Sequence, residues 1–282
     1  MFLVRRLLMP LLALFTMGWL AGGVAKAEEQ DAATKTPDQT TSATDAASAP
    51  DDDHLHVPLT IYLWAPGLHG TLGAHGYNTG VRATPRQLLS HFHLGLMAMG
   101  EIRKKRLLST LDFMWVNLDA SEGRATPFPD VPTLSAKAGF NQIVLTPKVG
   151  FRVINNKNFT IDGLAGIRYW NLGTTLNFTP APLGRTYGTS LSWVDPVVGM
   201  RFQAPLNNFL NFTLAGDVGG WGAGSQMDYQ IFGGISYKLK PTVLLEAGWR
   251  YLFVNYRSGS AVYEIAESGA AIGITFDGFK PK

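Results

Sequence analysis

The chain has 282 residues and no cysteine, which excludes disulfides, lipoprotein attachment and thiolate metal sites. Glycine (31 residues) and aromatic residues (11%) are frequent, whereas charged residues make up only 16%. This composition suits a β-protein with one face in an apolar environment. The basic residues are spread singly along the chain, so the sequence does not support nucleic-acid binding.

The N-terminus has the pattern of an export signal. Arg5 and Arg6 precede an almost wholly apolar run at 7–20, and an Ala-Lys-Ala tripeptide at 25–27 supplies the small residues that a signal peptidase recognises. An uncleaved membrane anchor is the alternative, because the apolar run is nearly long enough to span a bilayer. A glycine pair before the tripeptide and two acidic residues after it favour cleavage. We therefore predict that residues 1–27 are a signal peptide.

The next segment, 28–56, is predicted to be a disordered acidic linker. It holds eight acidic residues against Lys35 alone, and most of it consists of Ala, Thr, Ser, Asp and Pro. Too little apolar surface is present to offset the entropy lost on ordering it. Loss of the leader would also remove three of the 24 basic residues and none of the 21 acidic ones, leaving a neutral mature chain.

From residue 57 onward, apolar and polar residues alternate with the period of two that is typical of half-buried strands. In 142–153, for example, every odd position is apolar, whereas Gln142, Lys148 and Arg152 occupy even positions. The same separation of faces recurs in 191–203 and 242–254. A soluble sandwich also alternates, but a face that repeatedly carries both signs of charge is typical of a barrel with a polar lumen and an exterior in lipid.

The connections between these segments differ in length. Short ones are predicted at 103–106, 155–158, 205–208 and 238–241, and longer loops near 67–92, 119–136, 172–190, 219–227 and 255–261. Short turns on one side and long loops on the other are typical of outer-membrane barrels. With a first strand at 57–66 and a second at 94–103, we predict an all-β, transmembrane, antiparallel up-and-down β-barrel over 57–282, of ten strands, with eight as the alternative. A helical turn is expected at 85–91.

Outward-facing aromatic residues are predicted to form two girdles, as at the two interfaces of a membrane. The outer girdle would contain Trp115, Tyr169, Tyr229, Tyr251 and Phe253, and the inner one Phe151, Phe159, Phe202, Tyr237 and Phe276. The segment 270–276 alternates and ends in Phe276, like the terminal strand that the barrel-insertion machinery recognises.

Three motifs add a resemblance. The run WAPGLHG at 64–70, the tract 163–172 and the run GWRY at 248–251 resemble motifs of a broad group of uncharacterised small Gram-negative outer-membrane β-barrels. The architecture is distantly similar to that of OmpA-type and OmpW-type barrels. The resemblance covers about residues 57–276, implies the barrel fold, and implies no catalytic residues.

The charges expected on the inner face are the main candidate site. They are Glu101, Arg103, Asp112, Lys148, Arg152, Asp162, Arg168, Asp195, Arg201, Asp217, Lys238, Glu246 and Arg250. They could line a narrow solute path whose selectivity follows the balance of charge. The alternative is a salt-bridged plug, because eight to ten strands leave little open width.

Two further candidates are weaker. All six histidines lie between residues 54 and 93, but the expected topology divides them between the two ends of the barrel, so we expect solvated rim residues and no metal site. Ser90 is next to His91 and Ser109 is near Asp112, but adjacency in sequence is not the geometry of a catalytic triad. No Gly-x-Ser-x-Gly motif is present.

We therefore expect a monomeric barrel in the bacterial outer membrane, with a structural or narrow porin-like channel role and no enzymatic activity. The alternative is a barrel that binds a surface ligand or metal through the outer loops, and a lipid-modifying enzyme is a further alternative. The expected partners are outer-membrane lipid, the insertion machinery and, for a channel, a small solute. No cofactor is expected.

Overall fold

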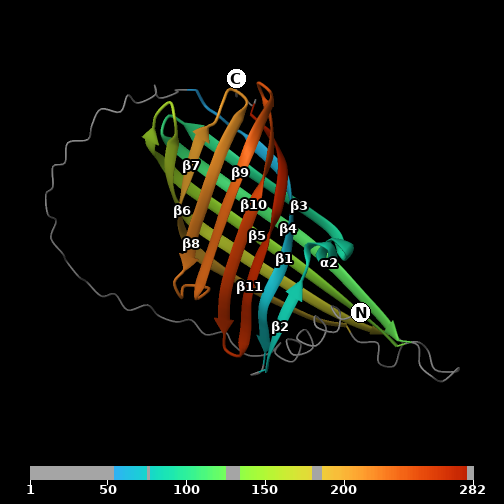
Figure 1. The fold of residues 1–282 in the computed structure, drawn as a ribbon. Coiled ribbons are helices and arrows are strands. Elements are labelled where there is room, and N and C mark those ends of the chain that lie inside the picture. Colours follow the sequence, from blue (N-terminus) through green and yellow to red (C-terminus); the bar gives the residue numbers. More distant parts are fainter. Residues whose placement is uncertain (1–53, 75–76, 125–133, 180–185, 278–282) are drawn as a thin grey trace, which may run out of the picture.

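The computed structural model describes residues 54–74, 77–124, 134–179 and 186–277, which form a closed antiparallel β-barrel (Figure 1). Ten strands make the ring: β1 (Leu59–Ala74), β3 (Phe92–Lys104), β4 (Leu107–Arg124), β5 (Leu134–Asn155), β6 (Thr160–Thr179), β7 (Thr186–Pro205), β8 (Leu210–Gly220), β9 (Met227–Lys240), β10 (Val243–Ser258) and β11 (Ala261–Phe276). The ring closes because β1 pairs with β11, from Leu59 opposite Phe276 to Gly73 opposite Val262. The predicted ten-stranded up-and-down barrel is confirmed. The predicted signal peptide and all but the last residues of the predicted linker lie outside the described residues.

Two elements lie outside the ring. The strand β2 (Tyr77–Ala83) pairs with the end of β1, and the helix α2 (Pro85–Ser90) follows it. The helix begins with a capping box, in which the Thr84 side chain accepts from the Gln87 backbone N–H and the Gln87 side chain accepts from the Thr84 backbone N–H. The predicted helical turn is thus confirmed. No helix in the described part of the chain is long and apolar enough to cross a membrane.

The two ends of the barrel differ. At the turn end, two to four residues connect β3 to β4, β5 to β6, β7 to β8 and β9 to β10, as predicted. At the opposite loop end, the strands run further than predicted: β1 has 16 residues, and β5 has 22. Half of the predicted loop at 119–136 and 13 of the 19 residues of the one at 172–190 are therefore strand, and the remaining residues lie outside the described ones. The sequence at 172–190, rich in Thr and Gly, looks like a loop, but the antiparallel ladder extends into it, with Thr175 opposite Gly188.

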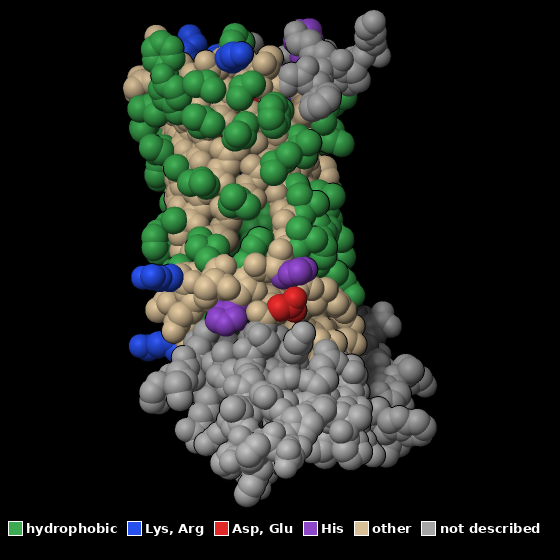
Figure 2. Space-filling model, turned by 90° about the vertical axis from the view of Figure 1, so that its right-hand side faces the viewer, with side chains coloured by type: hydrophobic (Ala, Val, Ile, Leu, Met, Phe, Trp, Pro, Cys, Tyr) green, Lys and Arg blue, Asp and Glu red, His purple; other side chains and the backbone are tan. Residues whose placement is uncertain are grey.

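The outward face of the wall is apolar. Val149, Leu107 and Ile272 are each more than 60% exposed there. On the side that carries α2, hydrophobic side chains cover most of the wall, and charged and histidine side chains lie at its two ends (Figure 2). A tall apolar exterior with charges only at its rims is the surface that a lipid bilayer stabilises.

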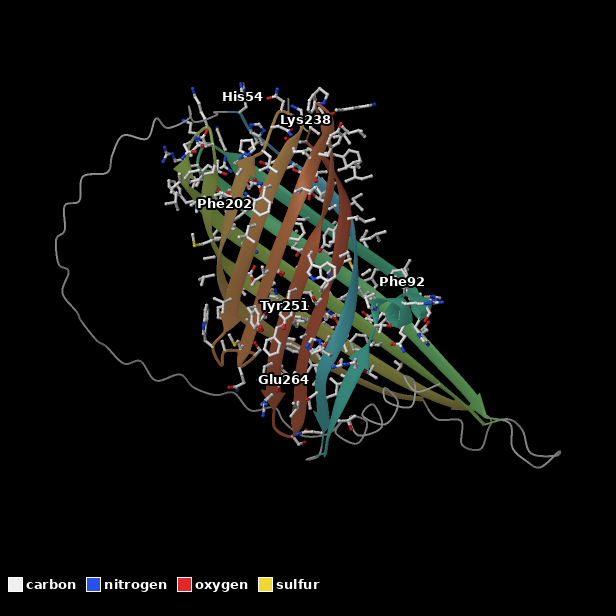
Figure 3. The ribbon with its side chains drawn as sticks, viewed as in Figure 1. His54, Phe92, Phe202, Lys238, Tyr251 and Glu264 are labelled. Atoms are coloured by element: carbon white, nitrogen blue, oxygen red, sulfur yellow. The ribbon has the colours of Figure 1, made fainter. Side chains whose placement is uncertain are left out.

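Outward aromatic residues stack at two levels of this wall. Phe159 and Phe202 stack with ring centroids 5.7 Å apart, and so do Tyr229 and Tyr251. Figure 3 places Phe202 nearer the turn end and Tyr251 nearer the loop end. This arrangement matches the two predicted girdles.

The inside of the barrel has two different halves. Toward the turn end the inward side chains are charged, whereas toward the loop end they form an apolar cluster. This lumenal cluster includes Trp64, Met97, Met114, Val144, Trp170, Leu172, Trp193, Leu252, Val254, Tyr263 and Ile265. The protein core is therefore inside the barrel, in its loop-end half.

Candidate functional site

A first group of charges lies in the lumen near the turn end. Asp162 on β6 is opposite Arg152 on β5 and Arg201 on β7, so the register of three neighbouring strands places one carboxylate between two guanidinium groups. Asp162 Oδ1 accepts from Arg152 Nε at 2.8 Å, and its Oδ2 accepts from Arg201 Nη2 at 2.8 Å. Arg201 also binds Glu101 on β3, which is 3.6 Å from Arg103. These five residues form one ionic network.

A second group lies at the middle of the barrel. Arg168 on β6 donates to Asp217 Oδ1 at 2.6 Å and to Asp228, and Lys148 donates to Asp217 Oδ2 at 2.7 Å. The Arg168, Asp217 and Asp228 side chains are at most 1% exposed. Burial of a charge costs free energy unless it is paired and hydrogen-bonded, and each of these charges has at least one opposite partner.

Arg250 on β10 completes the second group. Its guanidinium donates to Asp112 Oδ2 and Gln230 Oε1 at 2.8 Å and to the Tyr62 hydroxyl at 2.7 Å. The Tyr62 hydroxyl in turn donates to Asp112 Oδ1 at 2.6 Å. Both terminal nitrogens of this guanidinium therefore meet acceptors, as the planar fork of Arg allows.

Several of these ion pairs cross the lumen. At least three strands separate β4, which carries Asp112, from β10, which carries Arg250, in either direction around the ring. The same holds for Glu101 on β3 and Arg201 on β7. A side chain that bonds to the far wall occupies the space that a pore would need. The space left between the two groups is a cavity of about 170 Å³, bordered by Lys148, Asp217 and Glu246 among others.

The lumenal cluster closes the loop-end half. Trp193 stacks on Trp170 with ring centroids 5.6 Å apart and on Tyr256 at 4.0 Å. The Trp170 indole N–H donates to Asp228 Oδ2 at 3.0 Å, which joins the cluster to the second ionic group. Polar network and aromatic cluster thus follow each other along the axis without an intervening gap at this point.

The structure brings ten of the thirteen predicted lumen charges into ion pairs, and three have other surroundings. Asp195 accepts from the Trp193 indole N–H at 2.9 Å and the Ser225 backbone N–H at 2.6 Å. Glu246 accepts from the Thr275 hydroxyl at 2.6 Å. Lys238 is exposed at the turn end, where the β9–β10 register shifts (Figure 3).

The sequence reading missed Asp228, Tyr62, Glu267 and the inward tryptophans. The alternation of faces along β9 could have identified Asp228, because its even number places it on the same face as Gln230. Tyr62 and Trp170 were missed for a different reason: large apolar residues were assigned to the lipid face, although Trp170 has the same parity as Arg168. The buried Glu267 accepts from Gln142 Nε2 at 3.4 Å.

A polar hollow lies at the loop end of strands β4 to β7, mostly on the face opposite to the lumenal cluster. It measures about 450 Å³ and is bordered by Asn117, Asp119, Asn141, Thr174 and Ser190 among others. The side-chain oxygens of Asn117 and Asn141 are buried and have no hydrogen-bond partner among the described residues. A hollow with two unpaired acceptors has the capacity to hold a polar group that donates.

The remaining sequence candidates do not form a site. Ser90 Oγ is 3.2 Å from His91 Nδ1, but that nitrogen is also 2.8 Å from the Gln87 carbonyl, a contact within one helical turn. Ser109 and Asp112 face opposite sides of the wall, since Ser109 is exposed outside and Asp112 points into the lumen. Among the residues that the structure describes, no three His, Asp or Glu side chains gather as a metal ion would require.

Comparison with known proteins supports the fold alone. No family model matches the sequence, and no curated protein matches it significantly. The outer-membrane protease OmpT from Escherichia coli aligns over 80% of this chain and 97% of its own, at 8% identity and a TM-score of 0.50. The translocator domain of the autotransporter NalP from Neisseria meningitidis aligns over 80% and 89% (14% identity, TM-score 0.43). Ail, the attachment invasion locus protein of Yersinia pestis, aligns over 80% of this chain and 99% of its own (10% identity, TM-score 0.34). The chain therefore has the fold of the outer-membrane β-barrels.

Proposed function

We propose that the protein is a monomeric outer-membrane barrel with a closed lumen, and that its role is that of a rigid element of the membrane with no open pore. The observation that carries this proposal is the set of cross-lumen ion pairs, Arg250 to Asp112 and Arg201 to Glu101, backed by the lumenal cluster. Of the two interpretations left open by the sequence, channel and salt-bridged plug, this geometry favours the plug.

The proposed location follows from the apolar wall and the export signal predicted at residues 1–27. Lipid is then the solvent of the outer surface, the turn end faces the periplasm, and the loop end faces outward. Insertion would depend on the barrel-insertion machinery, with β11 and its terminal Phe276 as the recognised strand. The proposal assigns no catalytic step to Ser90 and His91, because both contact their own helical turn.

Planar-bilayer recording tests the closed lumen. The purified full-length barrel is expected to give no discrete conductance steps, because cross-lumen side chains and stacked tryptophans obstruct the axis at successive levels. A variant with both Arg201→Ser and Arg250→Ser is expected to stay silent too, since the lumenal cluster remains. Discrete steps from the unaltered protein, with ion preference reversed by Arg250→Glu, would establish the channel instead.

The polar hollow favours a second candidate, the binding of a polar surface ligand at the loop end. Asn117 and Asn141 would then accept hydrogen bonds from a hydroxyl-rich molecule such as a sugar. A panel of oligosaccharides is expected to include one that the unaltered protein retains and that the Asn117→Leu/Asn141→Leu variant loses, with the barrel still folded. Equal retention by both proteins, or retention by neither, would remove this candidate.

A further inference from the structure

The cavity between the two ionic groups is bordered by residues from opposite walls of the barrel. The Arg250–Asp112 pair, which crosses the lumen, borders it on the loop-end side. Thr110 also borders it and precedes Asp112 by two residues on β4. Glu246 borders it as well and precedes Arg250 by four residues on β10. The cavity therefore lies on the turn-end side of the Arg250–Asp112 pair.

The cavity approaches the turn end on the side of β7 to β10. Gln203 borders it two residues before the end of β7, and Thr213 borders it three residues after the start of β8. Near the rim, Pro205 on β7 and Lys238 on β9 are both exposed (Figure 3). The first ionic group takes its residues from β3 and β5 to β7, and none from β8 to β10. A small molecule therefore has a route into the cavity from the turn end.

Glu246 borders the cavity as a carboxylate without a cation. Its Oε1 accepts from the Thr275 hydroxyl at 2.6 Å, and the Thr275 oxygen lies 2.7 Å from the hydroxyl of Thr60. Because Thr275 donates to Glu246, Thr60 donates to Thr275, and the two hydroxyls together orient the carboxylate. Its Oε2 accepts no hydrogen bond from a described residue. The other charged side chains that border the cavity are all in ion pairs: Asp112, Lys148, Arg201, Asp217 and Arg250.

Thr110 is a second unsatisfied polar group at the same cavity. It is 7% exposed, and its hydroxyl has no hydrogen-bond partner in the part of the chain that the structure describes. A buried hydroxyl without a partner costs free energy, so it calls for a ligand or a water molecule. Thr110 and Glu246 are on opposite walls, since at least three strands separate β4 from β10 in either direction. A molecule in the cavity therefore meets two polar contacts from opposite sides.

The rest of the wall is partly apolar. Met99, Leu164 and Phe232 border the cavity and share the inward faces of Glu101, Asp162 and Gln230 on their strands. A short carbon chain would find apolar contacts there. Size is no obstacle, because a cavity of about 150 Å³ is enough for benzene. The signs of the charges favour a cation, since each cationic side chain at the wall already has a carboxylate partner.

We propose that this lumenal cavity binds a small amino alcohol, a short carbon chain with an ammonium group at one end and a hydroxyl at the other. The ammonium group donates to Glu246 Oε2, the hydroxyl group bonds to the Thr110 hydroxyl, and the chain contacts Met99 and Phe232. The proposal goes beyond the closed lumen: a ligand that enters from the turn end stops at the Arg250–Asp112 pair.

Titration calorimetry of the full-length protein in detergent tests the site. The probes are the linear amino alcohols from aminopropanol to aminohexanol. For the chain length that binds most tightly, the matched alkylamine lacks the hydroxyl and the matched diol lacks the ammonium group. We expect the alkylamine to bind about fivefold more weakly than the amino alcohol and the diol at least about tenfold more weakly, because hydrogen bonds to charged groups are the stronger ones.

Single substitutions assign the two ends of the ligand. Glu246→Gln is expected to weaken the amino alcohol about tenfold or more and to leave the diol unchanged. Thr110→Val is expected to reduce the amino alcohol to the affinity of the alkylamine and to leave the alkylamine unchanged. It removes no hydrogen bond within the described residues, so the barrel stays folded. Thr160→Val is the matched control, because the Thr160 hydroxyl is also buried without a partner but does not border the cavity.

Three results would overturn the site. They are no binding of any amino alcohol, equal binding of the amino alcohol and the diol, and equal affinity of the unaltered protein and Glu246→Gln. The first would mean that the cavity holds water alone. Bilayer conductance tests the closed lumen in a separate measurement, so either proposal can fail without the other.

Discussion

Replacement of Arg168 by Met is expected to destabilise the folded barrel by about 3–5 kcal/mol. The guanidinium is fully buried and is shared by Asp217 and Asp228, which come from the two strands β8 and β9. Met has a similar length but no charge, so Asp228 would keep only the Trp170 indole N–H as a donor. Most of the cost therefore comes from carboxylates left buried with too few partners.

The change in the free energy of unfolding can be measured by guanidinium titration in lipid vesicles, followed by the gel mobility of the unheated barrel. Arg257→Met is the matched control. Arg257 Nη2 lies 3.1 Å from Glu264 Oε2, but both side chains are exposed, and such pairs contribute at most about 1 kcal/mol. Equal effects of the two substitutions would mean that the lumenal network does not stabilise the barrel.

Replacement of Trp170 by Ala is expected to cost about 3–5 kcal/mol, as for other buried aromatic side chains. Trp170 is 1% exposed and stacks on Trp193 in the lumenal cluster. Its removal leaves a cavity inside the barrel and also takes a hydrogen-bond donor from Asp228. Trp170→Phe keeps most of the ring and should cost only about 1–3 kcal/mol, the value of the lost donor.

Trp249→Ala is the control for this second prediction. Its side chain is 58% exposed on the outer wall and donates to Ser268 Oγ at 2.9 Å. Because lipid fills the space that an outward side chain leaves, we expect well under half the cost of Trp170→Ala in the same unfolding titration. A larger loss from Trp249→Ala than from Trp170→Ala would contradict a core inside the barrel.

The architecture could be predicted because a period of two is a local property. Alternation places Asp162, Arg168 and Arg250 on one face whatever their partners are, and ten alternating segments separated by turns predict ten strands. The girdles follow from the same parity. The lengths of β5 to β7 could not be predicted, since segments rich in small and polar residues extend as strands only where a neighbouring strand supplies the ladder.

The pairing of the lumen charges could not be predicted either. Neighbours such as Arg152 and Asp162 follow from a hairpin register, but Arg250 meets Asp112 only because the closed ring brings β10 opposite β4. The apolar half of the lumen could not be predicted, because alternation indicates which residues share a face but not what that face contacts. Lys238 shows that alternation alone does not predict burial, since it shares the alternation of Ser236 but is exposed two residues from the end of β9.

The cross-lumen pairs also bear on how the circle forms. Arg250 and Asp112 are separated by 138 residues, and they can meet only after the sheet has curled until β1 lies against β11. A partly curled sheet would hold these side chains apart and gain nothing from their attraction, while its two free margins stayed unbonded. The cross-lumen pairs therefore stabilise the barrel only once the ring has closed. Partly closed intermediates lack this stabilisation, which favours concerted assembly.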